Sequence, residues 1–301
     1  MSSNRLSLIQ TTEYPPFLYG TAWKEDETRR LTHLALRQGF RGIDTANQRK
    51  HYFEAAVGEG IADAIEQGLI EREDIFVQTK FTHIHGQDAR LPYDAKAPAG
   101  EQVRQSLASS LEHLRMSYID SFILHGPSVR KGLTAADLDA WKAMESLHEE
   151  QQVGYLGVSN VSLEQLQTLC KVARIKPRFA QIRCYATRSW DRDFRDFCAA
   201  NDIVYQGFSL LTANRQVLNH ADMKSIARRY GKTPAQVVFR FAIEVGMLPL
   251  TGTKSAVHMA EDLDVCDFRL TISDCRSIER MADEVGGPPF RVKIKRPGED
   301  K

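Results

Sequence analysis

The chain has 301 residues, of which 42% are hydrophobic and 26% charged, as is usual for a globular protein with a sizeable core. Lys and Arg number 40 against 39 Asp and Glu, so the formal net charge is +1. No field of one sign favours nucleic acid or an anionic membrane, and we expect neither as a partner.

The cysteines and the first residues indicate the cellular compartment. Five cysteines lie far apart with no C-x-x-C pair, which argues for reduced thiols rather than a disulfide framework. The opening MSSNRLSLIQTTEYPP lacks the apolar core of a signal peptide, and no run of 18 apolar residues occurs. We therefore predict a cytoplasmic protein. We interpret the basic run at 291–296 as a solvated tail and residues 296–301 as disordered.

Short apolar runs alternate with helical segments from residue 17 almost to the end of the chain. These runs lack polar alternation, as expected for parallel strands that are covered on both faces. The expected strands are 17–19, 41–44, 75–80, 119–125, 153–160, 179–182, 203–208 and 247–250.

Between the runs lie amphipathic helices. Val103, Leu107, Leu111 and Leu114 form one apolar stripe at helical spacing. Two helix starts, Ser162…Gln165 and Thr233…Gln236, have the spacing of capping boxes, the second with Pro234 at its first helical position.

Roughly eight βα units predict one (β/α)8 (TIM) barrel, a single α/β domain over residues 1–301, although a doubly wound sheet would give a similar pattern. The irregular segment 81–100 predicts a functional loop at the barrel mouth, where Trp23 is also expected to line the substrate pocket. Tyr93 in that loop folds over the opening or simply packs.

Four expected strands end in polar residues: Asp44, Lys80, His125 and the pair Ser159–Asn160. The C-terminal ends of barrel strands surround the catalytic site. Each residue alone has a structural explanation, since Asp44 could cap a helix, Lys80 could snorkel and His125 could be a core histidine. Their joint occurrence is more informative than any one of them.

A carboxylate, an ammonium and a phenol together suit proton transfer. A free tyrosine has a pKa of about 10, which is too high for efficient exchange at neutral pH. A nearby ammonium lowers that pKa, and a carboxylate keeps the ammonium charged and oriented. A histidine can orient a substrate carbonyl through a hydrogen bond.

The chain resembles the aldo-keto reductase family over nearly its whole length. The matching segments are YGTAW (19–23), GFRGIDTA (39–46), AAVGEGIADAI (55–65), REDIFVQTK (72–80), YIDSFILHGP (118–127) and GYLGVSN (154–160). The resemblance implies a (β/α)8 fold, a monomer, and NAD(P)(H)-dependent reduction of a small aldehyde or ketone to an alcohol. It also implies that Asp44 and Lys80 tune Tyr52, the general acid, while His125 orients the substrate.

One departure concerns the tyrosine. It usually follows the aspartate by five residues, whereas here Tyr52 follows Asp44 by eight, in DTANQRKHYFEAAVG. Counting back from Val57–Gly58 places His51 in the tyrosine position. We predict Tyr52 as the proton donor and keep His51 as the alternative.

The cofactor-binding residues follow from the same resemblance. An aromatic side chain stacks on the nicotinamide ring through its π-face, a role that Phe can fill, although core packing would also explain it. Backbone amides can receive the pyrophosphate oxygens. The resemblance implies Ser159, Asn160 and Gln181 at the carboxamide, Phe208 at the nicotinamide, Ser209 and Leu211 at the pyrophosphate, and Glu261 and Asp262 at the adenine.

A second departure concerns the phosphate of NADP. The family pattern I-P-K-S, then four residues and Arg, here reads Leu250-Thr251-Gly252-Thr253 and then His258. Gly252 has no side chain, and His258 is mostly neutral near pH 7. Lys254 is the cation that remains close by. The resemblance still favours NADPH, with NADH as the alternative.

Three other interpretations explain parts of the sequence. His83-Ile84-His85 places two imidazoles on one face, but no cysteine or carboxylate completes a metal site, so we expect none. A strand-end lysine also suits a Schiff-base lyase, with Lys80 as nucleophile. A non-catalytic, nicotinamide-binding regulatory barrel is the remaining alternative.

Overall fold

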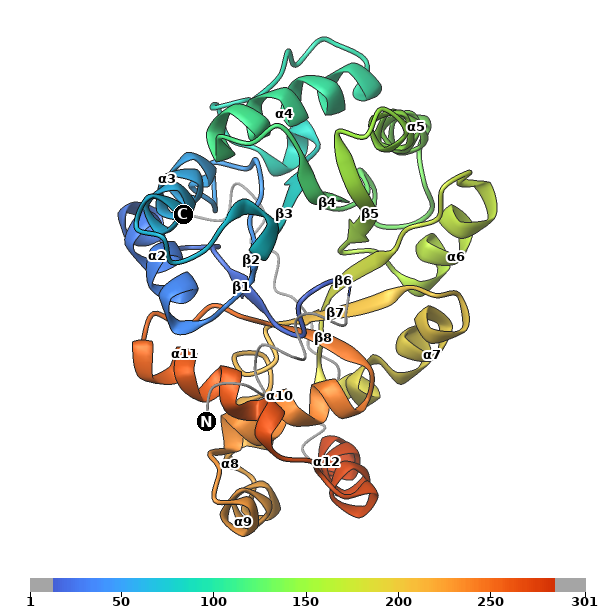
Figure 1. Ribbon diagram of the computed structural model, residues 1–301. Coiled ribbons are helices and arrows are strands. Elements are labelled where there is room, and N and C mark those ends of the chain that lie inside the picture. The colour runs from blue at the N-terminus through green and yellow to red at the C-terminus, as the bar shows by residue number, and fades with distance from the viewer. Residues whose placement is uncertain (1–12, 285–301) are drawn as a thin grey trace, which may run out of the picture.

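The computed structural model describes residues 13–284. Eight parallel strands close into a barrel in chain order, and β8 pairs with β1. Figure 1 looks into this barrel, with the strands at the centre and the helices around them. The strands are β1 (Leu18–Gly20), β2 (Gly42–Asp44), β3 (Phe76–Phe81), β4 (Ile119–Leu124), β5 (Val153–Ser159), β6 (Phe179–Arg183), β7 (Val204–Phe208) and β8 (Met247–Thr251). The predicted (β/α)8 barrel is confirmed, and each observed strand overlaps an expected one.

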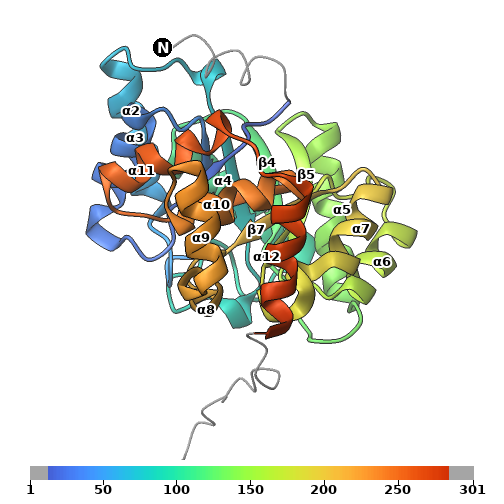
Figure 2. The same cartoon turned by 90° about the horizontal axis from the view of Figure 1, so that it is seen from below.

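The helices cover the outside of the barrel. Among residues 13–284, one follows each of β1 to β6, three lie between β7 and β8, and two follow β8. The last helix, α12, and α9 both pack against α10, and Figure 2 shows these three together. The helices are α2 (Thr28–Gln38), α3 (Glu54–Glu66), α4 (Ala99–Leu114), α5 (Ala135–Glu149), α6 (Leu163–Val172), α7 (Arg192–Ala200), α8 (Arg215–Asn219), α9 (Ala221–Tyr230), α10 (Pro234–Glu244), α11 (Ala256–Leu263) and α12 (Ile272–Glu284).

The helix signals in the sequence are confirmed. The side chain of Ser162 accepts a hydrogen bond from the backbone N–H of Gln165, and Thr233 does the same for Gln236, so both capping boxes form. Pro234 occupies the first turn of α10. The apolar stripe of α4 faces the core, which fixes the side of the helix that packs on the barrel.

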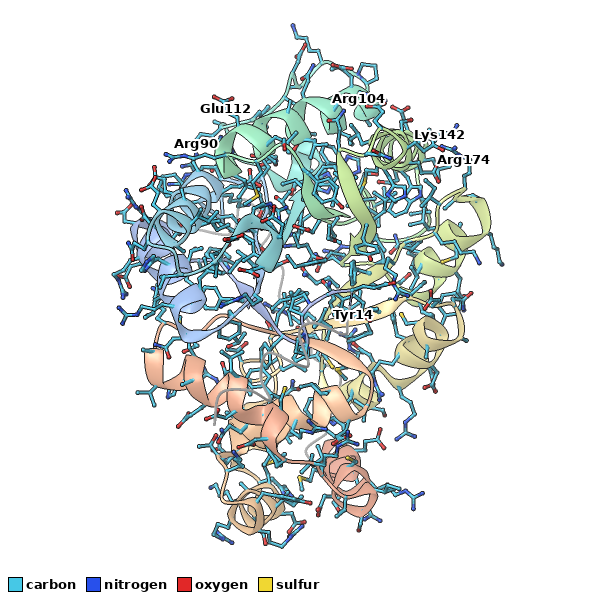
Figure 3. The ribbon with its side chains drawn as sticks, viewed as in Figure 1. Tyr14, Arg90, Arg104, Glu112, Lys142 and Arg174 are labelled. Atoms are coloured by element: carbon cyan, nitrogen blue, oxygen red, sulfur yellow. The ribbon has the colours of Figure 1, made fainter. Side chains whose placement is uncertain are left out.

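Apolar side chains fill the amino-terminal end of the barrel. Tyr14, which precedes β1, packs the edge of its ring against Phe179 at the start of β6, with 5.4 Å between ring centroids. Figure 3 labels Tyr14 close to the middle of the barrel. Phe76 at the start of β3 also packs against Phe179, at 5.8 Å. This packing leaves the polar side chains to the carboxyl ends of the strands.

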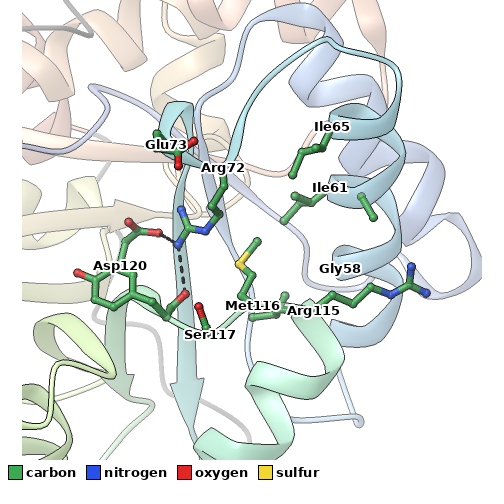
Figure 4. A pocket seen from close by; sticks show the side chains of 12 residues that line it. Gly58, Ile61, Ile65, Arg72, Glu73, Arg115, Met116, Ser117 and Asp120 are labelled. Atoms are coloured by element: carbon green, nitrogen blue, oxygen red, sulfur yellow. Dashed lines mark hydrogen bonds and ion pairs between the residues drawn. The ribbon is translucent and has the colours of Figure 1, made fainter.

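A cavity of about 440 Å³ lies between α3 and the turn from α4 to β4. Figure 4 shows Arg72 pointing toward Asp120 at its edge, where the guanidinium donates to the carboxylate at 2.7 Å. The residues that line this cavity include none of those that the sequence predicts for catalysis or cofactor binding.

Two further sequence predictions concern the rest of the chain. All five cysteines lie within the described residues, and no disulfide bond joins any two of them. Within residues 13–284, no helix is long and apolar enough to cross a membrane. The predicted solvated run at 291–296 and the predicted disordered end at 296–301 lie outside the described residues.

The contact between α3 and α4 requires a glycine. A Cβ on Gly58 would lie 2.1 Å from the carbonyl oxygen of His113 and 2.8 Å from the Cα of Leu114. We expect Gly58→Ala to push these helices apart and to lower the free energy of unfolding by about 1–3 kcal/mol, measured by urea denaturation. Glu66→Ala, on an exposed position of the same helix, is the control and should change it by less than about 0.5 kcal/mol. Equal effects of the two substitutions would contradict the argument.

Candidate active site

A cavity of about 1200 Å³ opens at the carboxyl ends of the strands. Every predicted catalytic, substrate or cofactor residue lines it except Lys80, which is fully buried against Asp44. The residues that line it include Asp44, Tyr52 and His125, the alternative donor His51, Trp23, and the predicted cofactor residues Ser159, Asn160, Gln181, Phe208, Ser209, Leu211, Thr253, Lys254, His258, Glu261 and Asp262. The fold therefore gathers residues from strand ends that are far apart in the sequence.

Lys80 and Asp44 form a buried ion pair. The Lys80 ammonium donates to Asp44 Oδ1 at 2.7 Å, to Asp44 Oδ2 at 2.8 Å and to the carbonyl oxygen of Thr45 at 2.7 Å. Burial lowers the pKa of Lys80, and the charge of Asp44 opposes that effect. All three N–H groups are used, so the Schiff-base alternative, which needs an accessible free amine, is not supported.

Three glutamines extend this pair across the barrel interior. Asp44 Oδ1 also accepts from Gln78 Nε2 at 2.7 Å and from Gln181 Nε2 at 2.9 Å. Both amides donate their second hydrogen to Gln206 Oε1, at 2.8 and 3.1 Å. Ser121 donates to Gln78 Oε1 at 2.9 Å. Gln78, Gln206 and Ser121 are not among the residues predicted from the sequence, although each is a polar residue inside an apolar strand run.

The side chains of Tyr52 and His51 have different neighbours. The Lys80 ammonium lies 5.1 Å from the centroid of the Tyr52 ring, and the His125 ring lies 5.9 Å from it. His51 instead lies beside Trp23, with 4.0 Å between ring centroids, and its Nδ1 is 2.9 Å from Gln48 Oε1. The longer loop thus places the tyrosine, rather than the histidine, near the buried cation.

The expected lowering of the tyrosine pKa is wrong. Burial raises the pKa of Tyr52 above its ordinary value, and the negative charge of Asp44 raises it further. The physical reason is that burial disfavours the charged phenolate, and the Lys80 ammonium, which both carboxylate oxygens of Asp44 hold, does not offset that cost. Tyr52 is therefore protonated at neutral pH.

His125 is held in its neutral form. Burial lowers its pKa to about 3, and the positive charge of Lys80 contributes to that shift. Its backbone N–H donates to the carbonyl oxygen of Phe81 at 2.8 Å. Its carbonyl oxygen accepts from Asn160 Nδ2, also at 2.8 Å. The imidazole thus faces the cavity as an uncharged group on a fixed backbone.

The segment 81–100 contributes to the cavity wall through Thr82, His83, His85 and Gly86. Tyr93 does not line the cavity. Its hydroxyl donates to the carbonyl oxygen of Thr82 at 2.7 Å, and its ring packs on Phe81. Of the two interpretations of Tyr93, packing is the one that the structure supports.

His83 and His85, the two histidines considered as metal ligands, lie beside each other in that segment. Their rings stack with 6.0 Å between centroids, and His83 Nε2 lies 3.0 Å from Asp137 Oδ1. Asp137 also accepts from the backbone N–H of Thr134 in the capping box of α5. Over residues 13–284, no three His, Cys, Asp or Glu side chains are grouped so as to hold a metal ion.

A lysine that the sequence analysis missed lies at the far end of the cavity. Lys24 directly follows the YGTAW segment, is almost fully buried, and donates from its ammonium to the carbonyl oxygen of Gly252. Burial and the positive charge of Lys254 together lower its pKa to about 8. A second cation therefore lies beside the segment where Gly252 has no side chain.

The closed barrel with its polar cavity at the carboxyl ends defines the chain as an α/β-barrel enzyme by class. Residues 17–283 match the Aldo/keto reductase family. The chain is 30% identical to a 9,11-endoperoxide prostaglandin H2 reductase of Trypanosoma cruzi, over 95% of each chain. It is 28% identical to a glyoxal reductase of Bacillus subtilis, over 94% of this chain and 95% of that one.

The structural comparison agrees. A crystal structure of a Bombyx mori aldo-keto reductase in complex with NADP matches with a TM-score of 0.76 and 26% identity, over 88% of each chain. The chain belongs to the aldo/keto reductase family and is an NAD(P)H-dependent oxidoreductase.

The buried ion pair gives a stability prediction. Lys80→Met should leave the Asp44 carboxylate buried without its cation and lower the free energy of unfolding by about 3–5 kcal/mol, measured by urea denaturation at neutral pH. Arg104→Met is the matched control, because Arg104 donates to Glu150 in an ion pair on the surface, where the loss should stay below about 1 kcal/mol. A Lys80 variant as stable as the control would refute this view of the pair.

Proposed function

We propose that this protein reduces small aldehydes and ketones to alcohols, with NADPH as reductant and Tyr52 as the proton donor. The observation that carries the proposal is the position of the Tyr52 ring, 5.1 Å from the buried Lys80 ammonium and 5.9 Å from the His125 ring. When bound, the nicotinamide cofactor supplies the hydride. The side chains supply the proton and the orientation of the carbonyl.

Each of the four polar side chains has a distinct role in this proposal. Tyr52 keeps its proton at neutral pH because burial raises its pKa, so it can give that proton to the carbonyl oxygen. His125, which is neutral, donates a hydrogen bond to the same oxygen and holds it in place. The Lys80–Asp44 pair fixes the polar floor beneath the phenol.

The far end of the cavity fits the adenosine part of the cofactor. Asp262 Oδ2 is buried and has no hydrogen-bond partner among residues 13–284, and burial raises the pKa of this carboxyl to about 7. An adenine amino group would supply the missing donor. Lys24 and Lys254 place two positive charges at the same end, which suits the additional phosphate of NADPH.

The mouth of the cavity suggests the substrate class. Trp23 is 64% exposed and lies beside His51, so an apolar wall borders the entrance. A glyoxal reductase is among the relatives, and we propose small aldehydes and dicarbonyl compounds as substrates. We further propose that the protein acts as a cytoplasmic monomer, as the resemblance implies.

The proton donor is tested by a pair of variants. Tyr52→Phe removes the proton and should lower kcat for aldehyde reduction by a factor of about 10²–10⁴, while NADPH binding persists. His51→Gln should retain most of the turnover, because His51 lies at the rim of the cavity. NADPH absorbance gives the rates, and cofactor fluorescence gives the binding. The reversed result would make His51 the donor.

Cofactor preference is tested by binding. We expect a lower Kd for NADPH than for NADH in fluorescence titrations, since the extra phosphate meets Lys24 and Lys254. Lys254→Met should weaken NADPH binding by about tenfold and change NADH binding little, as expected for loss of a charge-assisted contact. Lys171→Met removes an exposed lysine of α6 and should leave both constants unchanged. A clear preference for NADH would overturn this assignment.

A further inference from the structure

The hydroxyl group of Thr82 contacts the imidazole of His125, the proposed substrate-orienting histidine. Thr82 directly follows β3, is almost fully buried, and places its Oγ1 at 2.7 Å from Nδ1 of His125. The pairing of β3 with β4 brings the two residues together, since the backbone N–H of His125 donates to the carbonyl oxygen of Phe81. The contact therefore joins two strand ends at the floor of the cavity.

The surroundings fix which way the Thr82 side chain points. Its carbonyl oxygen accepts from the Tyr93 hydroxyl at 2.7 Å, which anchors the backbone. Its methyl group lies against Gly86, where an added Cβ would come within 2.7 Å of Thr82 Cγ2. With the methyl group held on that side, the hydroxyl is directed at the imidazole.

The number of available hydrogens decides which group donates in the hydrogen bond between Thr82 and His125. A neutral imidazole carries one N–H, on Nδ1 or on Nε2, and a threonine hydroxyl carries one hydrogen. Within residues 13–284, His125 Nδ1 is the one hydrogen-bond partner of Thr82 Oγ1. If Nδ1 carried the hydrogen, the hydroxyl hydrogen would have no acceptor among the described residues, at the cost of an unsatisfied donor on a side chain that is only 6% exposed. Donation by Thr82 to Nδ1 avoids that cost and leaves the hydrogen of the ring on Nε2.

We propose that Thr82 is a positioning residue that holds His125 in the tautomer protonated on Nε2, so that the histidine presents a hydrogen-bond donor to the substrate carbonyl. This inference rests on the proposed function for the role of His125. The tautomer itself is a property of the protein before any substrate binds. In the opposite tautomer Nε2 would be an acceptor and would repel a carbonyl oxygen.

The direct test is the protonation state of the ring nitrogens. Long-range ¹H–¹⁵N NMR spectra of protein labelled with ¹⁵N-histidine distinguish the two neutral tautomers, and His125→Asn identifies the signals by their loss. The spectra are recorded at neutral pH without cofactor or substrate. We expect the wild-type protein to carry the His125 proton on Nε2.

Two variants distinguish the role of the Thr82 hydroxyl from the packing of its methyl group. Thr82→Val keeps the shape and the methyl contact with Gly86 but removes the donor, whereas Thr82→Ser keeps the donor and removes the methyl group. We expect Thr82→Val to move a substantial share of His125 to the form protonated on Nδ1 and to lower kcat by about tenfold, with a smaller change in KM. Thr82→Ser should keep the wild-type tautomer and most of kcat.

Three outcomes would overturn the inference. A wild-type spectrum with the proton on Nδ1, or a Thr82→Val spectrum identical to that of the wild-type protein, overturns the inference. A loss of kcat shared equally by the Ser and Val variants also overturns it, because packing rather than the hydroxyl would then be responsible. If the protein reduces no carbonyl compound, the proposed function fails, while the spectra still decide the tautomer.

Discussion

The rest of the site depends on keeping Lys80 and Asp44 charged in the barrel interior. Removing two charges from water costs several kcal/mol for each ion, and only a full set of hydrogen bonds offsets that cost. The barrel provides this set through its register. Asp44 ends β2 directly beside Gln78 of β3, and Lys80, two residues further along β3, reaches both the carboxylate and the carbonyl oxygen of Thr45. A closed parallel barrel is what brings these groups into contact.

The polar layer also links the two halves of the proposed reaction. In most barrels of this type, branched apolar side chains fill the interior, and here apolar packing occupies the amino-terminal end. Toward the carboxyl end, Gln181, which the resemblance assigns to the nicotinamide carboxamide, donates to the same oxygen of Asp44 that holds Lys80. Gln206 joins Gln181 to Gln78. Gln181 therefore contacts the buried ion pair directly and also lines the cavity in which we propose that the cofactor binds.

The barrel was predictable from the sequence, because buried parallel strands and amphipathic helices leave periodic patterns, and strand ends carried Asp44, Lys80 and His125. Contacts across the barrel leave no such pattern. Lys24 meets the Gly252 carbonyl over 228 positions of sequence, and Gln78 meets Gln206 over 128. The predicted direction of the Tyr52 pKa shift was wrong because it, too, depends on contacts that the sequence does not show. Sequence order places a lysine and an aspartate on neighbouring strands, but it does not show how deeply the phenol is buried beside them.

The protonation states of Tyr52 and His125 suit the proposed reduction. Burial opposes the phenolate at Tyr52 and the imidazolium at His125, so each group facing the substrate oxygen is neutral and carries a hydrogen. A carbonyl oxygen that gains charge during hydride addition meets two donors at once. Alcohol oxidation instead requires the phenolate first, the form that burial and Asp44 both disfavour. The environment that keeps the proton on Tyr52 thus suits its proposed role as proton donor at neutral pH.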